Sequence, residues 1–241
     1  MKIEVLKNII DRYNCFINVS YDILVDENSK KVLLLSSQNK YYILKIYKVN
    51  NKLIQYKNEL EVLKNIFTEL LIGYGKTTVN SGVDQEEYAY ILTTYIFNNN
   101  NNNDIKKIAS SYCDFIKKVN NNNLSLIPEK DRIYGKIVED YGLISRNNCI
   151  IHGDIHIGNI IFGDNKVFFI DFENLSYTNI AFDIAALFET CNELNIANGY
   201  NLLEFLRLFK REGLFFSVSD VLFILFEIFR FEFEGDYLWK S

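Results

Sequence analysis

The chain of 241 residues is 49% hydrophobic, 15% aromatic and 24% charged. This composition excludes intrinsic disorder as the default state and supplies enough apolar side chains for a sizeable core. The formal net charge of −5 argues against a nucleic-acid backbone as the main partner, because such a partner calls for a basic face.

The first 96 residues have the pattern of a compact α+β lobe. Apolar residues near the N-terminus recur at three- and four-residue spacing and predict a helix on residues 3–13. Five β-rich runs separated by polar segments predict strands, the first three antiparallel, on residues 15–25, 30–37, 41–47, 70–78 and 88–94. A second helix is expected on residues 51–68, and the polar segment 80–87 is expected to be a loop.

The composition changes after residue 96, where two asparagine runs flank a helix predicted on residues 104–119. Asparagine runs form no core, so both are expected to be solvated loops. A helix around residues 131–143, a short strand on residues 148–151 and three apolar helices follow. We therefore expect two lobes, residues 1–96 and 97–241.

The sequence contains no recognisable secretory or membrane segment. The most apolar stretch, residues 213–229, is interrupted by polar and charged side chains and falls short of a membrane span. The four cysteines are scattered without a CxxC pair, which is typical of reduced thiols rather than of a disulfide framework or a zinc site. We expect a soluble, cytoplasmic protein with no membrane partner.

Polar residues that indicate chemistry are concentrated between Cys149 and Glu173, in the sequence CIIHGDIHIGNIIFGDNKVFFIDFE. Two apolar runs around a polar turn predict a β-hairpin, with Asn159 just before its first strand and Asp171 just after its second. These two side chains should meet at the open end of the hairpin, where an amide oxygen and a carboxylate suit Mg²⁺. Asp154 lies in the preceding loop and is a candidate base.

Two other interpretations of this segment are open. Asp and Asn commonly fill turns without any chemical role. The triplet pattern His152-x-Asp154-x-His156 could also indicate a zinc or two-metal hydrolase, but such sites use three or four protein ligands and usually include further His. The chain has only two His in total, so this interpretation is weak and phosphoryl transfer is favoured.

The loop HGDIHIGN, followed twelve residues after its Asn by DFE, resembles the H-G-D-x-x-x-x-N … D-[FW]-[DE] signature of the aminoglycoside phosphotransferase and choline kinase superfamily. Upstream, YYILKIY resembles the strand with the nucleotide-binding Lys; downstream, AFDIAALFE resembles the helix whose Asp supports the catalytic loop. The resemblance covers about residues 15–190. It implies an α+β, two-lobed protein-kinase-like fold, with an antiparallel sheet and one helix in the N-lobe and a mainly helical C-lobe.

The resemblance also implies roles for the C-lobe residues. Asp154 would accept or orient the proton of the substrate hydroxyl. Asn159 and Asp171 would hold Mg²⁺ at the ATP phosphates. His152 and Asp183 would support the loop rather than react. His156 is expected to support the same loop or face the cleft, and Glu173 could belong to the metal shell or to the substrate side.

In the N-lobe, Lys45 would contact the α- and β-phosphates and would be oriented by Glu59, with Glu61 as the less favoured alternative. Thr94 and Ile96 are assigned to the nucleotide by the same resemblance.

The sequence departs from the kinase pattern in the loop that covers the phosphates, which is glycine-rich in kinases. Here the turn is DENSK, and Asn28 and Ser29 could supply side-chain donors instead. Nucleotide affinity and the choice between ATP and GTP are therefore open.

For the acceptor, residues 170–189 resemble the corresponding stretch of choline and ethanolamine kinases. Aromatic and acidic residues alternate between 227 and 239, which suits an ammonium group, although core packing would give the same pattern. We expect ATP- and Mg²⁺-dependent phosphorylation of a small, cationic alcohol, with choline or ethanolamine as the leading candidate. An aminoglycoside or another metabolite (thiamine, homoserine, methylthioribose) is the alternative. A nucleotide-binding pseudokinase or a protein-modifying kinase is the alternative of another class, and the sequence does not indicate the oligomeric state.

Overall fold

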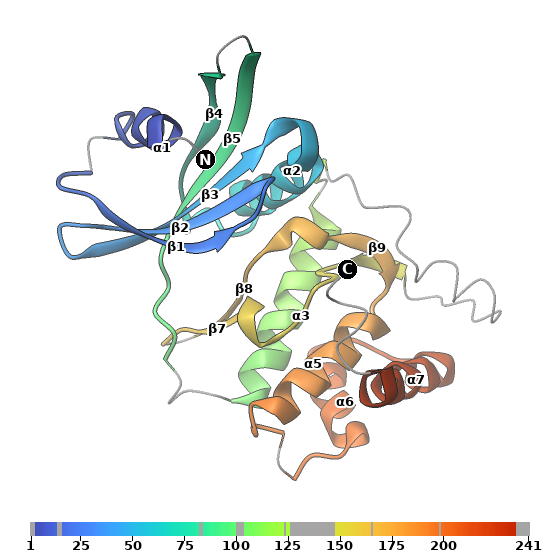
Figure 1. The fold of residues 1–241 in the computed structure, drawn as a ribbon. Helices are drawn as coiled ribbons and strands as arrows, with labels where there is room; N and C mark the ends of the chain where they lie inside the picture. Colours follow the sequence, from blue (N-terminus) through green and yellow to red (C-terminus); the bar gives the residue numbers. More distant parts are fainter. Residues whose placement is uncertain are drawn as a thin grey trace. The chain divides into compact units, whose positions relative to one another are not determined.

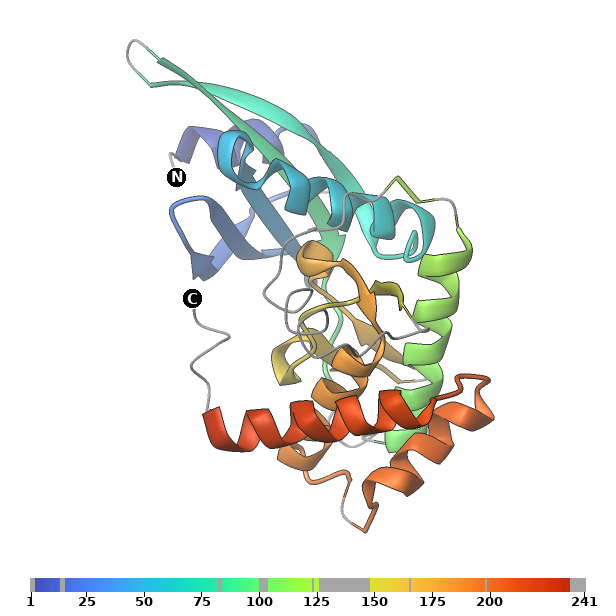
Figure 2. The same ribbon diagram turned by 90° about the vertical axis from the view of Figure 1, so that its right-hand side faces the viewer.

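The computed structural model describes residues 3–13, 16–81, 84–99, 104–122, 124–125, 148–164, 166–197 and 199–234. The chain divides into two compact units, Met1–Ile96 with Leu124–Ile127 and Phe97–Asn123 with Pro128–Ser241. Figures 1 and 2 show the elements of each unit. Among the described residues, no helix is long and apolar enough to cross a membrane.

The N-terminal unit contains one antiparallel sheet with strand order β1-β2-β3-β5-β4 (Figure 1). Its strands are β1 (Ser20–Asp26), β2 (Lys30–Ser37), β3 (Lys40–Lys48), β4 (Leu71–Ser81) and β5 (Asp84–Thr94). All four pairings are antiparallel, so the expected five-stranded sheet is confirmed.

The β4–β5 hairpin is longer than predicted and extends beyond the other strands (Figure 2). The prediction of a loop over residues 80–87 was wrong for its described part, because Asn80 pairs with Gln85 and Ser81 with Asp84. Oppositely charged side chains on neighbouring strands explain how so polar a segment stays in the sheet. Lys48 pairs with Glu86 at 2.7 Å, and Lys76 pairs with Glu87 at 2.9 Å.

Two helices pack on the sheet of this unit, α1 (Ile3–Ile10) and α2 (Val49–Asn65). Because side chains alternate along a strand, neighbouring residues of β3 lie on opposite faces. The face of Leu44 and Ile46 forms a buried cluster with the apolar side of α1. Lys45 and Tyr47 lie on the opposite face, where α2 packs. Each face of β3 therefore has its own helix, and the polar contacts lie on the α2 face.

The C-terminal unit is mainly helical, with two small two-stranded sheets. Its helices are α3 (Ile105–Asn121), α5 (Ala181–Glu193), α6 (Leu202–Arg211) and α7 (Val218–Glu234). One sheet pairs β6 (Asn148–Ile151) with β9 (Ser176–Asn179), and the other is the hairpin of β7 (Ile160–Phe162) and β8 (Val167–Phe169). The expected hairpin and the helical character of this unit are confirmed. The helix predicted on residues 131–143 lies outside the described residues.

Buried aromatic rings form much of the core of this unit. The fully buried ones come from α3, β8, the turn after β8, α6 and α7: Tyr112, Phe115, Phe169, Phe172, Phe205, Phe209 and Phe223. Phe115 stacks on Phe172, with ring centroids 5.5 Å apart. The large apolar area buried by these rings is the main stabilising contribution to the unit.

The described asparagines of the two runs make specific hydrogen bonds, and Asn120 and Asn121 belong to α3 rather than to the loop that the sequence predicted. The amide oxygen of Asn98 accepts from the backbone N–H of Phe162 at 3.1 Å, and the backbone N–H of Asn99 donates to the Phe162 carbonyl at 2.7 Å. Asn120 makes the same kind of pair with Ile150, donating to its carbonyl and accepting from its N–H. These side chains satisfy exposed backbone groups at strand edges that would otherwise pair only with water.

Candidate active site

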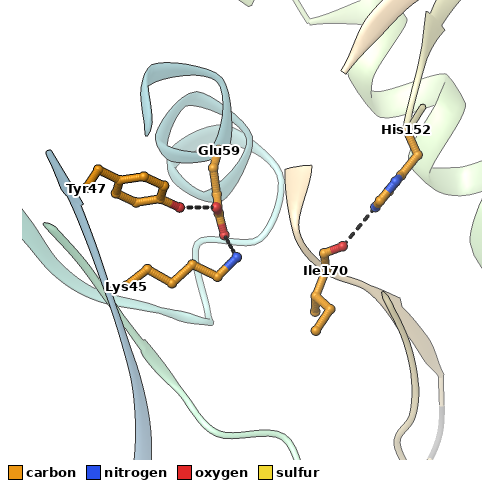
Figure 3. Close-up of polar contacts among 5 residues, drawn as sticks. All are labelled: Lys45, Tyr47, Glu59, His152 and Ile170. Carbon is orange, nitrogen blue, oxygen red and sulfur yellow. Dashed lines mark hydrogen bonds and ion pairs between the residues drawn. The ribbon is translucent and has the colours of Figure 1, made fainter. Parts of the chain in front are cut away.

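In the N-terminal unit, Lys45 forms an ion pair whose carboxylate is almost completely buried (Figure 3). Its ammonium lies 2.7 Å from Oε1 of Glu59, a residue that is 4% exposed. The hydroxyl of Tyr47 donates to the other oxygen of Glu59 at 2.6 Å. The two oxygens are thus bound by groups on alternate residues of β3, which fixes the carboxylate and holds the ammonium in one place.

The structure distinguishes between the two glutamates considered for this pair. Glu61 accepts from the backbone N–H of Ser125 at 3.2 Å, so its carboxylate is directed elsewhere. Two residues along a helix are about 200° apart, which explains the different directions. Glu59 is therefore the partner of Lys45. The contribution of Tyr47 was missed from the sequence, where it is one of many tyrosines.

Apolar side chains surround Lys45 on its face of the sheet. Strand pairing places Val32 and Ile91 directly beside Lys45, and Leu34 and Thr93 beside Ile43. Leu34, Ile43 and Thr93 are only half-buried. A cation next to a partly open apolar surface is chemically suited to a ligand with an aromatic ring and a phosphate group.

The glycine-free turn between β1 and β2 closes without left-handed backbone. None of residues 26–30, all of which are described, has a positive φ, so the turn does not need glycine. Glu27 N–H donates to the Lys30 carbonyl at 2.9 Å, and Lys48 N–H donates to the Ser29 carbonyl at 2.8 Å. Asn28 is exposed and Ser29 half-buried. Their side chains are accessible at the tip of this hairpin.

The two residues assigned to the nucleotide at the end of β5 differ in position. Thr94 pairs with Tyr42, so its side chain is on the sheet face opposite Lys45, and its backbone N–H donates to the Leu70 carbonyl. Ile96 follows the strand and is half-buried. Any contact of Thr94 with a ligand on the Lys45 face would therefore use its backbone rather than its hydroxyl.

In the C-terminal unit, Asp183 organises the start of the loop that contains Asp154. Its carboxylate is 2% exposed and accepts three hydrogen bonds. Two are from backbone N–H groups, of His152 at 2.7 Å and of Gly153 at 3.0 Å, and the third is from the Tyr112 hydroxyl at 2.9 Å. The first turn of α5 thus fixes a loop about thirty positions earlier in the chain. Tyr112 was not predicted as a member of the site.

Burial shifts the pKa values of both Asp183 and Tyr112. Burial raises the pKa of Asp183, although His152, the two backbone amides and the Tyr112 hydroxyl oppose the rise. Burial also raises the pKa of Tyr112 well above its usual value, and the nearby Asp183 adds to that effect. Tyr112 therefore remains a neutral hydrogen-bond donor.

Gly153 is the residue that allows the loop to pass close to the segment after β8. Its φ is +77°, in the left-handed region, and a Cβ here would lie 2.2 Å from the carbonyl oxygen of Asn174. Both observations exclude a side chain at this position without a shift of the backbone. The glycine between His152 and Asp154 is therefore a steric requirement.

His152 lies in the aromatic core and not in a reactive position. The residue is completely buried, and its Nε2 is 2.9 Å from the carbonyl oxygen of Ile170 (Figure 3). A carbonyl oxygen can only accept, so Nε2 holds a proton and donates it to this carbonyl. His156, by contrast, is exposed and accepts from the Gly158 N–H through Nδ1, which caps the short 3-10 turn Ile157–Asn159.

Asp154 and Asn159 are joined within the loop. The side-chain amide of Asn159 donates to the backbone carbonyl of Asp154 at 2.9 Å. Since that carbonyl only accepts, the NH₂ group must face it and the amide oxygen must point away. The half-buried Asp154 carboxylate accepts from the amide of Asn174 at 2.8 Å through Oδ2. Asn174 was also missed, because nothing in its sequence context distinguishes it from an ordinary turn residue.

The hairpin places Asn159 next to the residue before Asp171. Ile170 N–H donates to the Asn159 carbonyl at 3.0 Å, which extends the β7–β8 pairing by one position. Asp171 has a φ of +66° and begins the 3-10 turn Phe172–Asn174. Asp171 is half-buried and Glu173 is 6% exposed. Amide and carboxylate oxygens of this kind fit Mg²⁺, which prefers hard oxygen ligands and needs few from the protein.

The structure describes only some of the acidic and aromatic residues near the C-terminus. Asp220 is buried and accepts from Ser217 and from the Asn179 amide, so it joins β9 to the start of α7. Glu227 is 1% exposed, and Phe229 is 54% exposed. The side chains beyond residue 229, including the predicted aromatic ones, lie outside the description. An aromatic site for a cation stays a prediction.

Comparison with known proteins gives one family match and matches to solved structures. Residues 128–206, which include the loop, the hairpin, all of α5 and the first half of α6, match the model of the phosphotransferase enzyme family. The resemblance to the aminoglycoside phosphotransferase and choline kinase superfamily is confirmed. Together with the fold, the match indicates a small-molecule phosphotransferase. The comparison with curated proteins found no match.

Solved structures of this superfamily share the fold at low sequence identity. An aminoglycoside-3′-phosphotransferase of type VIII is 13% identical, with a TM-score of 0.58 over 92% of this chain and 96% of that chain. The amicoumacin kinase hAmiN, in complex with AMP-PNP, Ca²⁺ and Ami, is 11% identical, with a TM-score of 0.59 over 95% and 87%. The choline kinase LicA from Streptococcus pneumoniae is 16% identical, with a TM-score of 0.51 over 94% and 97%.

Proposed function

We propose that the protein transfers the γ-phosphoryl group of ATP, in a Mg²⁺-dependent reaction, to a hydroxyl group of a small cationic molecule. The observation that supports this most is the internal geometry of the loop from His152 to Asn159. Its backbone is bound by Asp183, and the amide of Asn159 donates to the Asp154 carbonyl. A carboxylate and an amide oxygen are thereby held on one short, fixed segment.

Each residue has a chemical task in this proposal. Asp154 orients the acceptor hydroxyl and takes up its proton as the new bond to phosphorus forms. Asn159 and Asp171 supply oxygen ligands to Mg²⁺, which when bound neutralises charge on the ATP phosphates. Lys45, fixed by Glu59, places a further positive charge on phosphate oxygens. Glu173, next to these ligands in the chain and buried, is an additional acidic group of the same turn.

The nucleotide base is assigned to the apolar surface beside Lys45. Leu34, Ile43 and Thr93 are half-buried and lie with the buried Val32 on one face of the sheet. A purine ring could stack on such a surface, with its phosphates directed toward the ammonium. Asn28 and Ser29 are the accessible polar side chains of the β1–β2 turn, and we assign them to phosphate contacts in place of glycine amides.

A cationic acceptor is supported by charge. The chain has a formal net charge of −5, and the C-terminal unit contains the buried acids Glu173 and Glu227. Choline or ethanolamine remains the leading candidate because residues 170–189 resemble that group of kinases. Aminoglycosides are also cationic alcohols, and one of the structural neighbours named above is an aminoglycoside-3′-phosphotransferase. The acceptor screen must therefore contain both classes.

The test is an ATP-consumption assay with Mg²⁺ over choline, ethanolamine, several aminoglycosides, thiamine, homoserine and methylthioribose. We expect ADP release that depends on one acceptor, and a phosphorylated product by mass spectrometry. Asp154→Asn should lower kcat by about 10²- to 10⁴-fold with Mg-ATP binding retained. Asp114→Asn, at an exposed position of α3, is the control. Absence of both turnover and Mg-ATP binding in the wild type would favour a different class of function.

A further inference from the structure

The turn after β8 contains two polar residues, Asp171 and Asn174, which have different roles in the proposed site. Asp171 adopts a left-handed backbone conformation, and the 3-10 turn Phe172–Asn174 follows directly. Asn174 is the last residue of this turn. At that position its amide donates to Oδ2 of Asp154 at 2.8 Å.

The turn has other contacts that hold it in place. Phe172 is 1% exposed and packs on Phe115 and His152. The backbone carbonyl of Asn174 lies against Gly153, where only a glycine leaves room for it. The path of the chain is thus set by an aromatic anchor and a close backbone approach. These contacts fix the turn without the Asn174 side chain, and the hydrogen bond from that side chain orients the Asp154 carboxylate.

The carboxylate of Asp154 would otherwise have rotational freedom. It is half-buried, and torsions of the carboxylate group are broad and roughly two-fold. A donor on Oδ2 selects one orientation and leaves Oδ1 as the oxygen for a second partner. The Asn159 amide fixes the backbone of the same residue. Two asparagine amides therefore determine the position of Asp154, one at its carbonyl and one at its carboxylate.

We propose that Asn174 is a positioning residue for phosphoryl transfer: it holds the Asp154 carboxylate so that Oδ1 meets the acceptor hydroxyl. The inference rests on the proposed function, since it assigns Asp154 the role of base. It also explains why a half-buried asparagine occupies the position directly after Asp171-Phe172-Glu173. The proton moves from the acceptor hydroxyl to Oδ1 while the acceptor oxygen bonds to phosphorus and the bond to ADP breaks.

The test compares Asn174→Leu, which removes the donor and keeps the same number of side-chain heavy atoms, with Asn174→Gln, which keeps an amide. Asn192→Leu, at an exposed position near the end of α5, is the matched control. Steady-state kinetics uses the acceptor found in the screen, or water as acceptor in ATP hydrolysis. We expect kcat of Asn174→Leu to fall about 10- to 100-fold, with the KM for Mg-ATP within about twofold of wild type. Asn174→Gln should retain kcat within about fivefold, because it can still donate.

The outcomes separate this inference from the proposed function. An active wild type with an Asn174→Leu variant of unchanged kcat would overturn the inference alone. A fall in kcat accompanied by an equal loss of Mg-ATP binding and of thermal stability would also overturn it, because the amide would then only support the fold. A wild type with no transfer and no hydrolysis would refute the proposed function, and this inference with it.

Discussion

Replacing Asp183 with alanine should destabilise the C-terminal unit strongly and release the loop that contains Asp154. The carboxylate is 2% exposed and accepts from the backbone of His152 and Gly153 and from the Tyr112 hydroxyl. Alanine removes all three acceptor contacts at once. Because water has little access to this position, the donors have no replacement partner.

The size of the effect follows from these contacts. A buried donor that loses its partner costs about 1–3 kcal/mol, and the donors of His152 and Tyr112 are buried while that of Gly153 is partly so. Removing a buried carboxylate, whose pKa is raised by burial, offsets part of this cost. The expected net loss is about 2–5 kcal/mol, because three donors lose their acceptor at once. That is a large share of a stability of about 5–15 kcal/mol.

Two measurements test this prediction. Urea unfolding followed by circular dichroism should show a lower midpoint for Asp183→Ala, and Glu193→Ala, at the exposed end of the same helix, should match wild type. Hydrogen exchange with mass spectrometry should show faster exchange in peptides that cover residues 149–159. A free energy of unfolding within about 0.5 kcal/mol of wild type, with unchanged exchange in this segment, would refute the reasoning.

Three further predictions concern other parts of the molecule. Glu59→Gln should weaken Mg-ATP binding about tenfold in titration calorimetry because Lys45 loses its charged partner, whereas Glu61→Gln should bind as wild type; equal losses would contradict the assignment. Asn120→Ala should lower stability to urea by about 1–2 kcal/mol through two lost strand-edge bonds, while the exposed Asn122→Ala should change it by less than about 0.5 kcal/mol. Burial raises the pKa of the three described thiols from 9.0 to about 12. As the pH rises, the unfolded chain loses these protons before the folded chain does, so the urea midpoint should fall between pH 9 and pH 12. An unchanged midpoint would show that the thiols are not buried.

Local patterns in the sequence determined much of the fold. β-rich runs between polar segments predicted the strands, and the helices predicted on residues 3–13, 51–68 and 104–119 lie close to the observed α1, α2 and α3. The position of Asn159 and Asp171 at the open end of one hairpin also followed from sequence, because a two-stranded hairpin aligns residues at fixed offsets from its turn. These features depend on backbone geometry over a few residues, which the local sequence controls. The loop predicted over 80–87 failed because cross-strand ion pairs, which local composition does not reveal, keep that polar segment in the sheet.

Only the tertiary structure decided which side chains support the candidate site. The contacts of Asp183 with the loop join positions about thirty residues apart, and the amide of Asn174 reaches an aspartate twenty residues earlier. The choice of Glu59 over Glu61 depended on the direction in which α2 packs on β3. Such contacts result from how whole elements pack, so many residues far apart in the chain determine each of them. The sequence by itself therefore indicated the candidate site residues by type and spacing, whereas their orientation is a property of the packed chain.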